Sequence, residues 1–72
     1  MERQYVESSN IKSIGFDEST SVLEVEFNNC VVWQYYDVPE YIWYEFLNAE
    51  YKGKFFNANI KNAYNGKRVE YP

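Results

Sequence analysis

The sequence predicts an α+β fold: a three-stranded antiparallel meander over residues 11–16, 21–27 and 31–36, followed by two helices over residues 39–50 and 54–64 that pack on one face. Two patterns support this fold. Apolar residues alternate with polar ones in the first half of the chain, as in half-buried strands, and recur at helical spacing in the second half. Since no helical segment separates the strands, a doubly wound parallel sheet is excluded.

The first two expected strands have a clear period of two. Residues 11–16 place Ile14 and Phe16 on one side, and the turn-forming sequence DEST follows. Residues 21–27 put three apolar residues on one face and two glutamates on the other, namely Leu23, Val25 and Phe27 against Glu24 and Glu26. We expect the glutamate face to lie in water.

The register of the third expected strand, residues 31–36, depends on the length of the hairpin loop before it. A three-residue loop over residues 28–30 pairs Val25 with Trp33 and gathers every large apolar residue on one face. A two-residue loop would turn Trp33 outward, because a shift of one residue reverses every side chain. The pattern therefore favours the three-residue loop.

A helix over residues 39–50 fits the sequence that follows. Pro39 suits the first turn, where its missing N–H is not needed, and Glu40 lies near the positive end of the helix dipole. Placing residues about 100° apart gives two faces. The face expected to pack on the sheet contains Ile42, Trp43, Phe46, Leu47 and Ala49, and the other contains Tyr41, Tyr44, Asn48 and Tyr51.

Lys52-Gly53 is expected to interrupt this helix. The second helix, residues 54–64, aligns three apolar side chains that we expect in the core, Phe56, Ile60 and Tyr64. Asn65-Gly66 fits its C-cap. The remaining residues either add a short strand or fray.

Composition narrows the class of protein. The chain has 72 residues, of which 46% are hydrophobic and 21% aromatic, so we expect a single folded domain over residues 1–72. No apolar stretch reaches the roughly 20 residues of a membrane-spanning helix, and the first ten residues lack a secretory signal. We therefore expect no membrane partner. Cys30 is the single cysteine, which excludes an internal disulfide and, like the missing secretory signal, favours a cytoplasmic protein.

Several short motifs occur together in a fixed order. They are Ser8-Ser9-Asn10-Ile11, Ile14-Gly15-Phe16-Asp17, Leu23-Glu24-Val25-Glu26-Phe27, Trp33-Gln34-Tyr35, Asp37-Val38-Pro39 and Lys52-Gly53-Lys54-Phe55-Phe56-Asn57 with Ile60. In this order, residues 6–64 resemble the KTSC domain, named for the lysyl-tRNA synthetase C-terminal region. The resemblance implies a short bacterial or phage-type protein, or an appendage of a lysyl-tRNA synthetase. The family has no established function, and RNA binding is the role proposed for it.

Three positions depart from the family pattern. The central Tyr-x-Tyr is Trp33-Gln34-Tyr35 here, which keeps an aromatic pair that we expect to be structural but removes one hydroxyl. The hairpin loop has asparagine or cysteine where the family often has glycine. The Ser-x-Gly before the last helix reads YKG, so a role that depends on that serine does not transfer.

Nothing in the sequence indicates catalysis. The chain has no histidine and one thiol, and it lacks a phosphate-binding glycine loop and a cluster with metal-ligand spacing. Glu24 and Glu26 form the closest carboxylate pair, and such pairs on a wet strand usually serve solubility. We therefore expect a non-enzymatic domain without catalytic residues, metal, cofactor or small-molecule substrate.

Charge is distributed unevenly along the chain. Residues 52–72 carry five basic side chains and one acidic, whereas residues 1–51 carry two basic and ten acidic. This asymmetry, with aromatic residues between the cations, favours RNA, either tRNA-like or single-stranded, as a partner. The candidate contacts are Lys52, Lys54, Phe55, Lys61, Lys67 and Arg68. Pairing of these cations within the protein is the alternative.

A second hypothesis is contact with a protein partner or with a second copy in a homodimer. The stripe of Tyr41, Tyr44, Asn48 and Tyr51 would offer rings whose hydroxyls tolerate water, which is typical of contact sites. The alternative is that the C-terminal tail covers some of these tyrosines. An exposed sheet edge would also allow association, and the strand over residues 11–16 is the expected edge.

Overall fold

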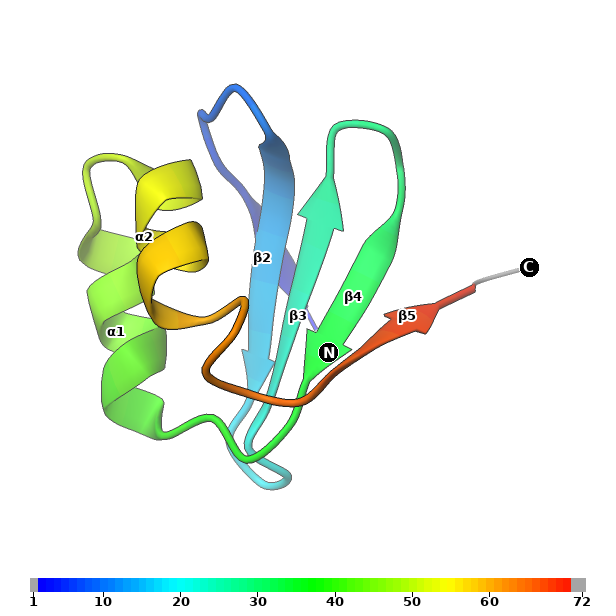
Figure 1. The fold of residues 1–72 in the computed structure, drawn as a ribbon, viewed down its shortest axis with the longest axis vertical. Coiled ribbons are helices and arrows are strands. Elements are labelled where there is room, and N and C mark those ends of the chain that lie inside the picture. Colours follow the sequence, from blue (N-terminus) through cyan, green and yellow to red (C-terminus); the bar gives the residue numbers. More distant parts are fainter. Residues whose placement is uncertain (1, 71–72) are drawn as a thin grey trace.

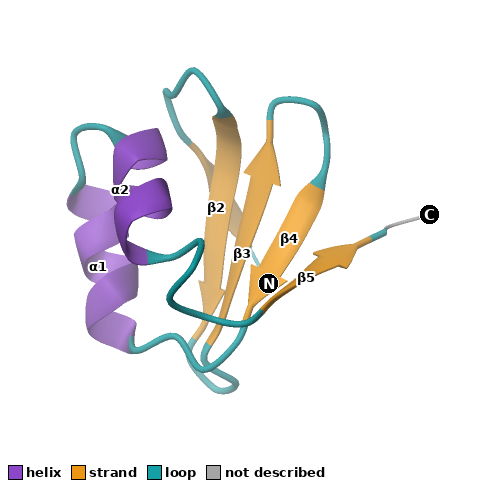
Figure 2. Ribbon diagram, viewed as in Figure 1, coloured by secondary structure: helices purple, strands orange, loops and turns teal. Residues whose placement is uncertain are grey.

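The computed structural model describes residues 2–70 and consists of a five-stranded antiparallel sheet with two helices on one face (Figures 1 and 2). Its elements are β1 Arg3–Tyr5, β2 Ile11–Asp17, β3 Val22–Phe27, β4 Val32–Tyr35, α1 Glu40–Asn48, α2 Lys52–Asn59 and β5 Gly66–Val69. The strands lie side by side in sequence order. The α+β class and the three central strands are confirmed, and the sheet has two further strands.

The two additional strands form the edges of the sheet. β1 pairs with β2, so the prediction that residues 11–16 form an exposed edge is wrong. β5 pairs with β4, which decides between the two alternatives for the C-terminal segment in favour of a strand. Both are short and largely exposed, so apolar alternation could not indicate them.

The predicted register of β3 and β4 is confirmed. Val25 lies opposite Trp33, and the Phe27 amide donates to the Val31 carbonyl at 2.9 Å, so the hairpin loop has three residues. The last loop residue, Cys30, has a φ of 68°, the left-handed region that glycine favours. Its side chain is exposed.

A bulge in β2 explains the spacing of its apolar residues. Ile11 lies opposite Phe27 while Ser13 lies opposite Glu26, so two steps along β2 match one step along β3. Ile11 and Ile14 are consequently both buried, at 1% and 0% exposure.

The face of β3 that carries Glu24 is less exposed to solvent than predicted. Glu24 is 4% exposed, and its carboxylate lies 3.3 Å from the Arg3 guanidinium and accepts a hydrogen bond from Gln34 Nε2 at 2.9 Å. The Ser13 hydroxyl donates to Glu26 at 2.8 Å. The sequence did not predict β1, and it is β1 that brings Arg3 to Glu24 and covers this face.

The core lies between the other face of the sheet and the helices. As predicted, α1 buries Ile42, Trp43 and Phe46 against the sheet. The helix ends at Asn48, two residues before the predicted end, and the Lys52 ammonium donates to the carbonyls of residues 47 and 49 at 3.2 and 2.8 Å. This cation therefore satisfies carbonyls that the end of α1 leaves without an intrahelical partner.

α2 differs from the predicted helix at both ends. It starts at Lys52, so Gly53 lies inside it, and it ends at Asn59. The amides of Ile60 and Lys61 both donate to the Phe56 carbonyl at 3.0 Å, and a turn follows. Ile60 is fully buried and Tyr64 packs against the core, so the apolar spacing continues beyond the helix. The predicted C-cap at Asn65-Gly66 is therefore wrong, because β5 starts at Gly66.

Candidate functional site

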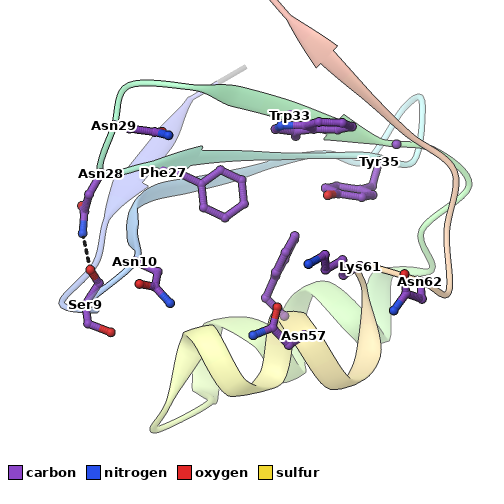
Figure 3. A pocket seen from close by; sticks show the side chains of 12 residues that line it. Ser9, Asn10, Phe27, Asn28, Asn29, Trp33, Tyr35, Asn57, Lys61 and Asn62 are labelled. Atoms are coloured by element: carbon purple, nitrogen blue, oxygen red, sulfur yellow. Dashed lines mark hydrogen bonds between the residues drawn. The ribbon is translucent and has the colours of Figure 1, made fainter.

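A groove of about 690 Å³ opens between the sheet and α2 (Figure 3). One part of its lining is aromatic and comes from β3, β4 and α2: Phe27, Trp33, Tyr35 and Phe56. The other part is polar: Ser9, Asn10, Asn28, Asn29, Asn57, Lys61 and Asn62. Gly66, at the start of β5, completes the lining.

The aromatic rings of the groove support one another. Trp33 and Tyr35 lie nearly parallel, with centroids 6.3 Å apart and planes 21° apart, and Tyr35 meets Phe56 edge to face at 5.5 Å. Tyr35 and Phe56 are buried, whereas Trp33 is half-buried. In Figure 3 the rings of Trp33 and Tyr35 are seen nearly edge-on, so their faces turn toward α2. Trp33 can therefore offer a face to a ligand. Phe27 is also half-buried, but its ring meets Phe56 edge to face at 5.4 Å.

Tyr35 is fixed in this position from two sides. A Cβ added to Gly66 would lie 2.5 Å from Cε1 of the Tyr35 ring, so the β5 backbone passes directly over the ring. Burial raises the pKa of the Tyr35 hydroxyl, which therefore stays protonated at neutral pH. The predicted structural role of Tyr35 agrees with this placement.

The polar lining of the groove contains no carboxylate, although the chain has 11 acidic residues. Five of the polar lining residues are asparagines, and the one with a charged side chain is Lys61. Asn28 Nδ2 donates to the Ser9 carbonyl at 2.7 Å and joins two loops. Within residues 2–70, the side-chain amides of Asn10, Asn57 and Asn62 make no hydrogen bond to protein, so they can bind a ligand.

A smaller hollow of about 260 Å³ adjoins the groove. The two share Ser9, Asn10 and Asn57 as lining residues. The smaller hollow is lined by Lys52 and Lys54, and also by acidic residues, Glu7 and Glu50. Its charge is therefore mixed, in contrast to the groove.

The structure brings together only part of the predicted RNA-contact set. Lys61 lines the groove, and Lys52 and Lys54 line the adjoining hollow. The ammonium of Lys54 lies 5.3 Å from the centre of the Tyr51 ring. Phe55 is half-buried and stacks on Phe46 at 5.5 Å, so it belongs to the core and is not an exposed stacking surface.

The two basic residues of β5 have different neighbours. Lys67 is opposite Gln34, whose side chain bonds Glu24 on the face of the sheet away from the helices. Arg68 is opposite Trp33 in the β4–β5 pair, and it also lines a hollow with Arg3 and Glu26. Lys67 therefore lies apart from the groove, whereas Arg68 lies on the strand position next to Trp33.

The sequence did not predict that five asparagines would line one groove; they are Asn10, Asn28, Asn29, Asn57 and Asn62. They come from the loop before β2, the β3–β4 hairpin, α2 and the turn after α2, so no local pattern joins them. The available signal was compositional, since the chain contains eight asparagines and five of them line the groove.

The tyrosines of the stripe are exposed, which favours the first of the two alternatives left open by the sequence. α1 ends at Asn48, however, so Tyr51 lies beyond the helix on which the stripe was predicted. Tyr41, Tyr44 and Tyr51 are 61%, 46% and 63% exposed. Glu40, and then Glu18, raise the pKa of the Tyr44 hydroxyl by charge repulsion, which places this part of the stripe in acidic surroundings.

Within residues 2–70, the structure contains neither a metal-binding cluster nor a membrane-spanning helix. No group of three or more histidine, cysteine, aspartate or glutamate side chains is arranged to hold a metal ion. Neither described helix has the length and apolar character needed to cross a membrane.

Comparison with known proteins identifies the family. The sequence model of the KTSC domain matches residues 7–64. The chain is 34% identical over 61 residues to an uncharacterised protein of Stutzerimonas stutzeri, covering 85% of this chain and 86% of that protein. It is also 34% identical over 58 residues to a lysine–tRNA ligase of Nostoc punctiforme, covering 81% of this chain and 10% of the ligase.

A solved structure gives the same result. A KTSC domain protein of Yersinia pestis superimposes on this chain with a TM-score of 0.93 and 38% sequence identity, covering 96% of this chain and 97% of that protein. The chain therefore belongs to the KTSC domain family.

Proposed function

We propose that this KTSC domain is a cytoplasmic, non-enzymatic module that binds RNA in the groove between the sheet and α2. The observation that carries the proposal is the composition of the groove, which combines aromatic rings, amides and Lys61 and has no carboxylate, in a chain of net charge −4. RNA offers bases that stack on rings, base edges that bond amides, and phosphates that attract a cation.

A relative supports the same ligand class. The matching region of the Nostoc punctiforme protein is part of a lysine–tRNA ligase, an enzyme whose name includes an RNA substrate. A domain that helps to hold RNA is a reasonable addition to such an enzyme. We infer that the matching region of the ligase contacts its tRNA, and we propose the same ligand class for the present chain.

Reversing the charge of Lys61 tests the proposal. We expect Lys61→Glu to weaken tRNA binding about tenfold and to make its salt dependence shallower by about one counterion, because one phosphate contact is lost. The measurement is an amide-resolved NMR titration of labelled protein with bulk tRNA at low and moderate salt. In the unsubstituted protein, the amides of the groove should shift, and the shifts should fade as salt rises.

Lys67→Glu is the matched control. It makes the same change in charge on β5, at a position opposite Gln34 on the other face of the sheet. We expect it to retain most of the binding. Equal weakening by both variants would show that binding does not take place in the groove, and the absence of shifts at high concentrations of both molecules would refute RNA binding.

Protein contact through the tyrosine stripe is the second candidate, favoured by the exposure of Tyr41 and Tyr51. It predicts association that rises with concentration and is nearly indifferent to salt. We expect replacement of both tyrosines with serine to abolish it, as measured by sedimentation, and to leave RNA binding unchanged. A protein that stays monomeric at high concentration in both forms would contradict self-association.

A further inference from the structure

We propose that the groove holds one unpaired base of single-stranded RNA, stacked on the exposed face of Trp33. This inference rests on the proposed RNA-binding function and specifies which form of RNA is bound. It starts from the position of Trp33 at the outer end of the series of rings, where it is half-buried and next to a buried tyrosine.

The ring of Trp33 is held in place by its neighbours in the sheet. Trp33 lies opposite Val25 in the middle of the β3–β4 pair, and Tyr35 lies beside it with its ring nearly parallel. Tyr35 is in turn held by Phe56 on one side and by the β5 backbone at Gly66 on the other. A ring held in this way binds another flat ring with little loss of side-chain freedom.

The groove has the size and polarity for one nucleotide. Its volume of about 690 Å³ is within the range of ordinary small-molecule sites. Asn57 and Asn62, from α2 and the turn after it, bring amide donors and acceptors to the side facing the rings, and Lys61 lies between them in the sequence. Amides suit the edge of a base, and the ammonium suits its phosphate.

Stacking on Trp33 selects against double-stranded RNA. In a duplex both faces of each base are covered by neighbouring bases, and the narrow major groove keeps side chains away from the base edges. Apart from the outer faces of its two terminal pairs, a duplex offers no base face to the indole, whereas an unpaired nucleotide can place its base there. Single strands, loops and unpaired ends are therefore the RNA class that fits the groove.

The test compares two RNA probes and two substitutions. The probes are a short oligoadenylate and a long, fully paired RNA duplex with blunt ends and no loop, and the readouts are binding affinity and tryptophan fluorescence. The second tryptophan, Trp43, is 8% exposed and stacks on Phe16, so quenching on binding reports Trp33. We expect oligoadenylate to quench the fluorescence and to bind more tightly than the duplex.

Trp33→Leu removes the ring, and we expect it to weaken oligoadenylate binding about tenfold, the usual loss for one stacked base. Trp33→Tyr keeps a ring and restores the family's Tyr-x-Tyr pattern, so it should retain binding and lose the quenching. This second variant keeps the test decisive if leucine disturbs the fold, which the amide spectrum will show.

The outcomes separate this inference from the proposed function. Salt-sensitive RNA binding that depends on Lys61 but not on Trp33, or equal affinity for the duplex and oligoadenylate, would overturn base stacking and leave RNA binding intact. Failure of both probes and of tRNA to bind would refute the proposed function and this inference together.

Discussion

Replacing Phe46 with alanine should leave most of the protein unfolded at room temperature. Phe46 is fully buried, stacks on Phe55 at 5.5 Å and lies 6.5 Å from the ring of Phe56. Removing a buried phenylalanine ring costs about 3–5 kcal/mol. A single core in a domain of this length supplies about 3–5 kcal/mol of net stability, so the loss is comparable to the whole. Urea unfolding followed by circular dichroism measures it.

Tyr41→Ala provides the control on the same helix. Tyr41 is 61% exposed, so its truncation should change the free energy of unfolding by less than about 0.5 kcal/mol. A Phe46→Ala protein that unfolds cooperatively at the same urea concentration as the original would show that the core is not centred on this ring.

The central hairpin could be predicted from the sequence because its constraints are local. Alternating residues in β3 and β4 left two possible registers, and burial of Trp33 with Val25 favoured one of them. The bulge in β2 required more than alternation, because it is the pairing with β3 that brings Ile11 and Ile14 to the same face. β1 could not be predicted, since its three residues carry no apolar alternation.

For a related reason, the sequence could not show which basic and aromatic residues share the site. The sequence groups Lys52 with Arg68 in one basic segment, but the turn after α2 reverses the chain and β5 carries Lys67 and Arg68 to the far edge of the sheet. Phe55 reads as an aromatic residue between cations, whereas the helix turns it onto Phe46. Spacing shows where a charge lies in the chain, and only the fold shows which surface it shares.

Gly15→Ala should detach β1 from the sheet. The N-terminal segment passes at an angle behind β2 (Figure 1), and a Cβ on Gly15 would lie 2.5 Å from the backbone carbonyl oxygen of Glu2 and 2.8 Å from Cγ of Arg3. The carbonyl cannot move without β1, so the strand shifts and the contact between Arg3 and Glu24 is lost. We expect a loss of about 1–3 kcal/mol, the range for overpacking at a close contact. Hydrogen exchange should show faster exchange of the β1 amides.

Gly53→Ala is the matched control, and its effect should have the opposite sign. The nearest atoms to an added Cβ at Gly53 are 3.7 and 3.8 Å away, on Asn10 and Ser8, which is ordinary contact. Because Gly53 lies within α2, alanine should stabilise the protein by about 0.5–1 kcal/mol through the smaller entropy of the unfolded chain. If both substitutions left the free energy of unfolding and the hydrogen exchange of the β1 amides unchanged, this result would contradict the close approach of β1 to Gly15. A loss of stability in Gly15→Ala together with a gain in Gly53→Ala would show that β1, which brings Arg3 to Glu24, can pair with β2 only because residue 15 has no side chain.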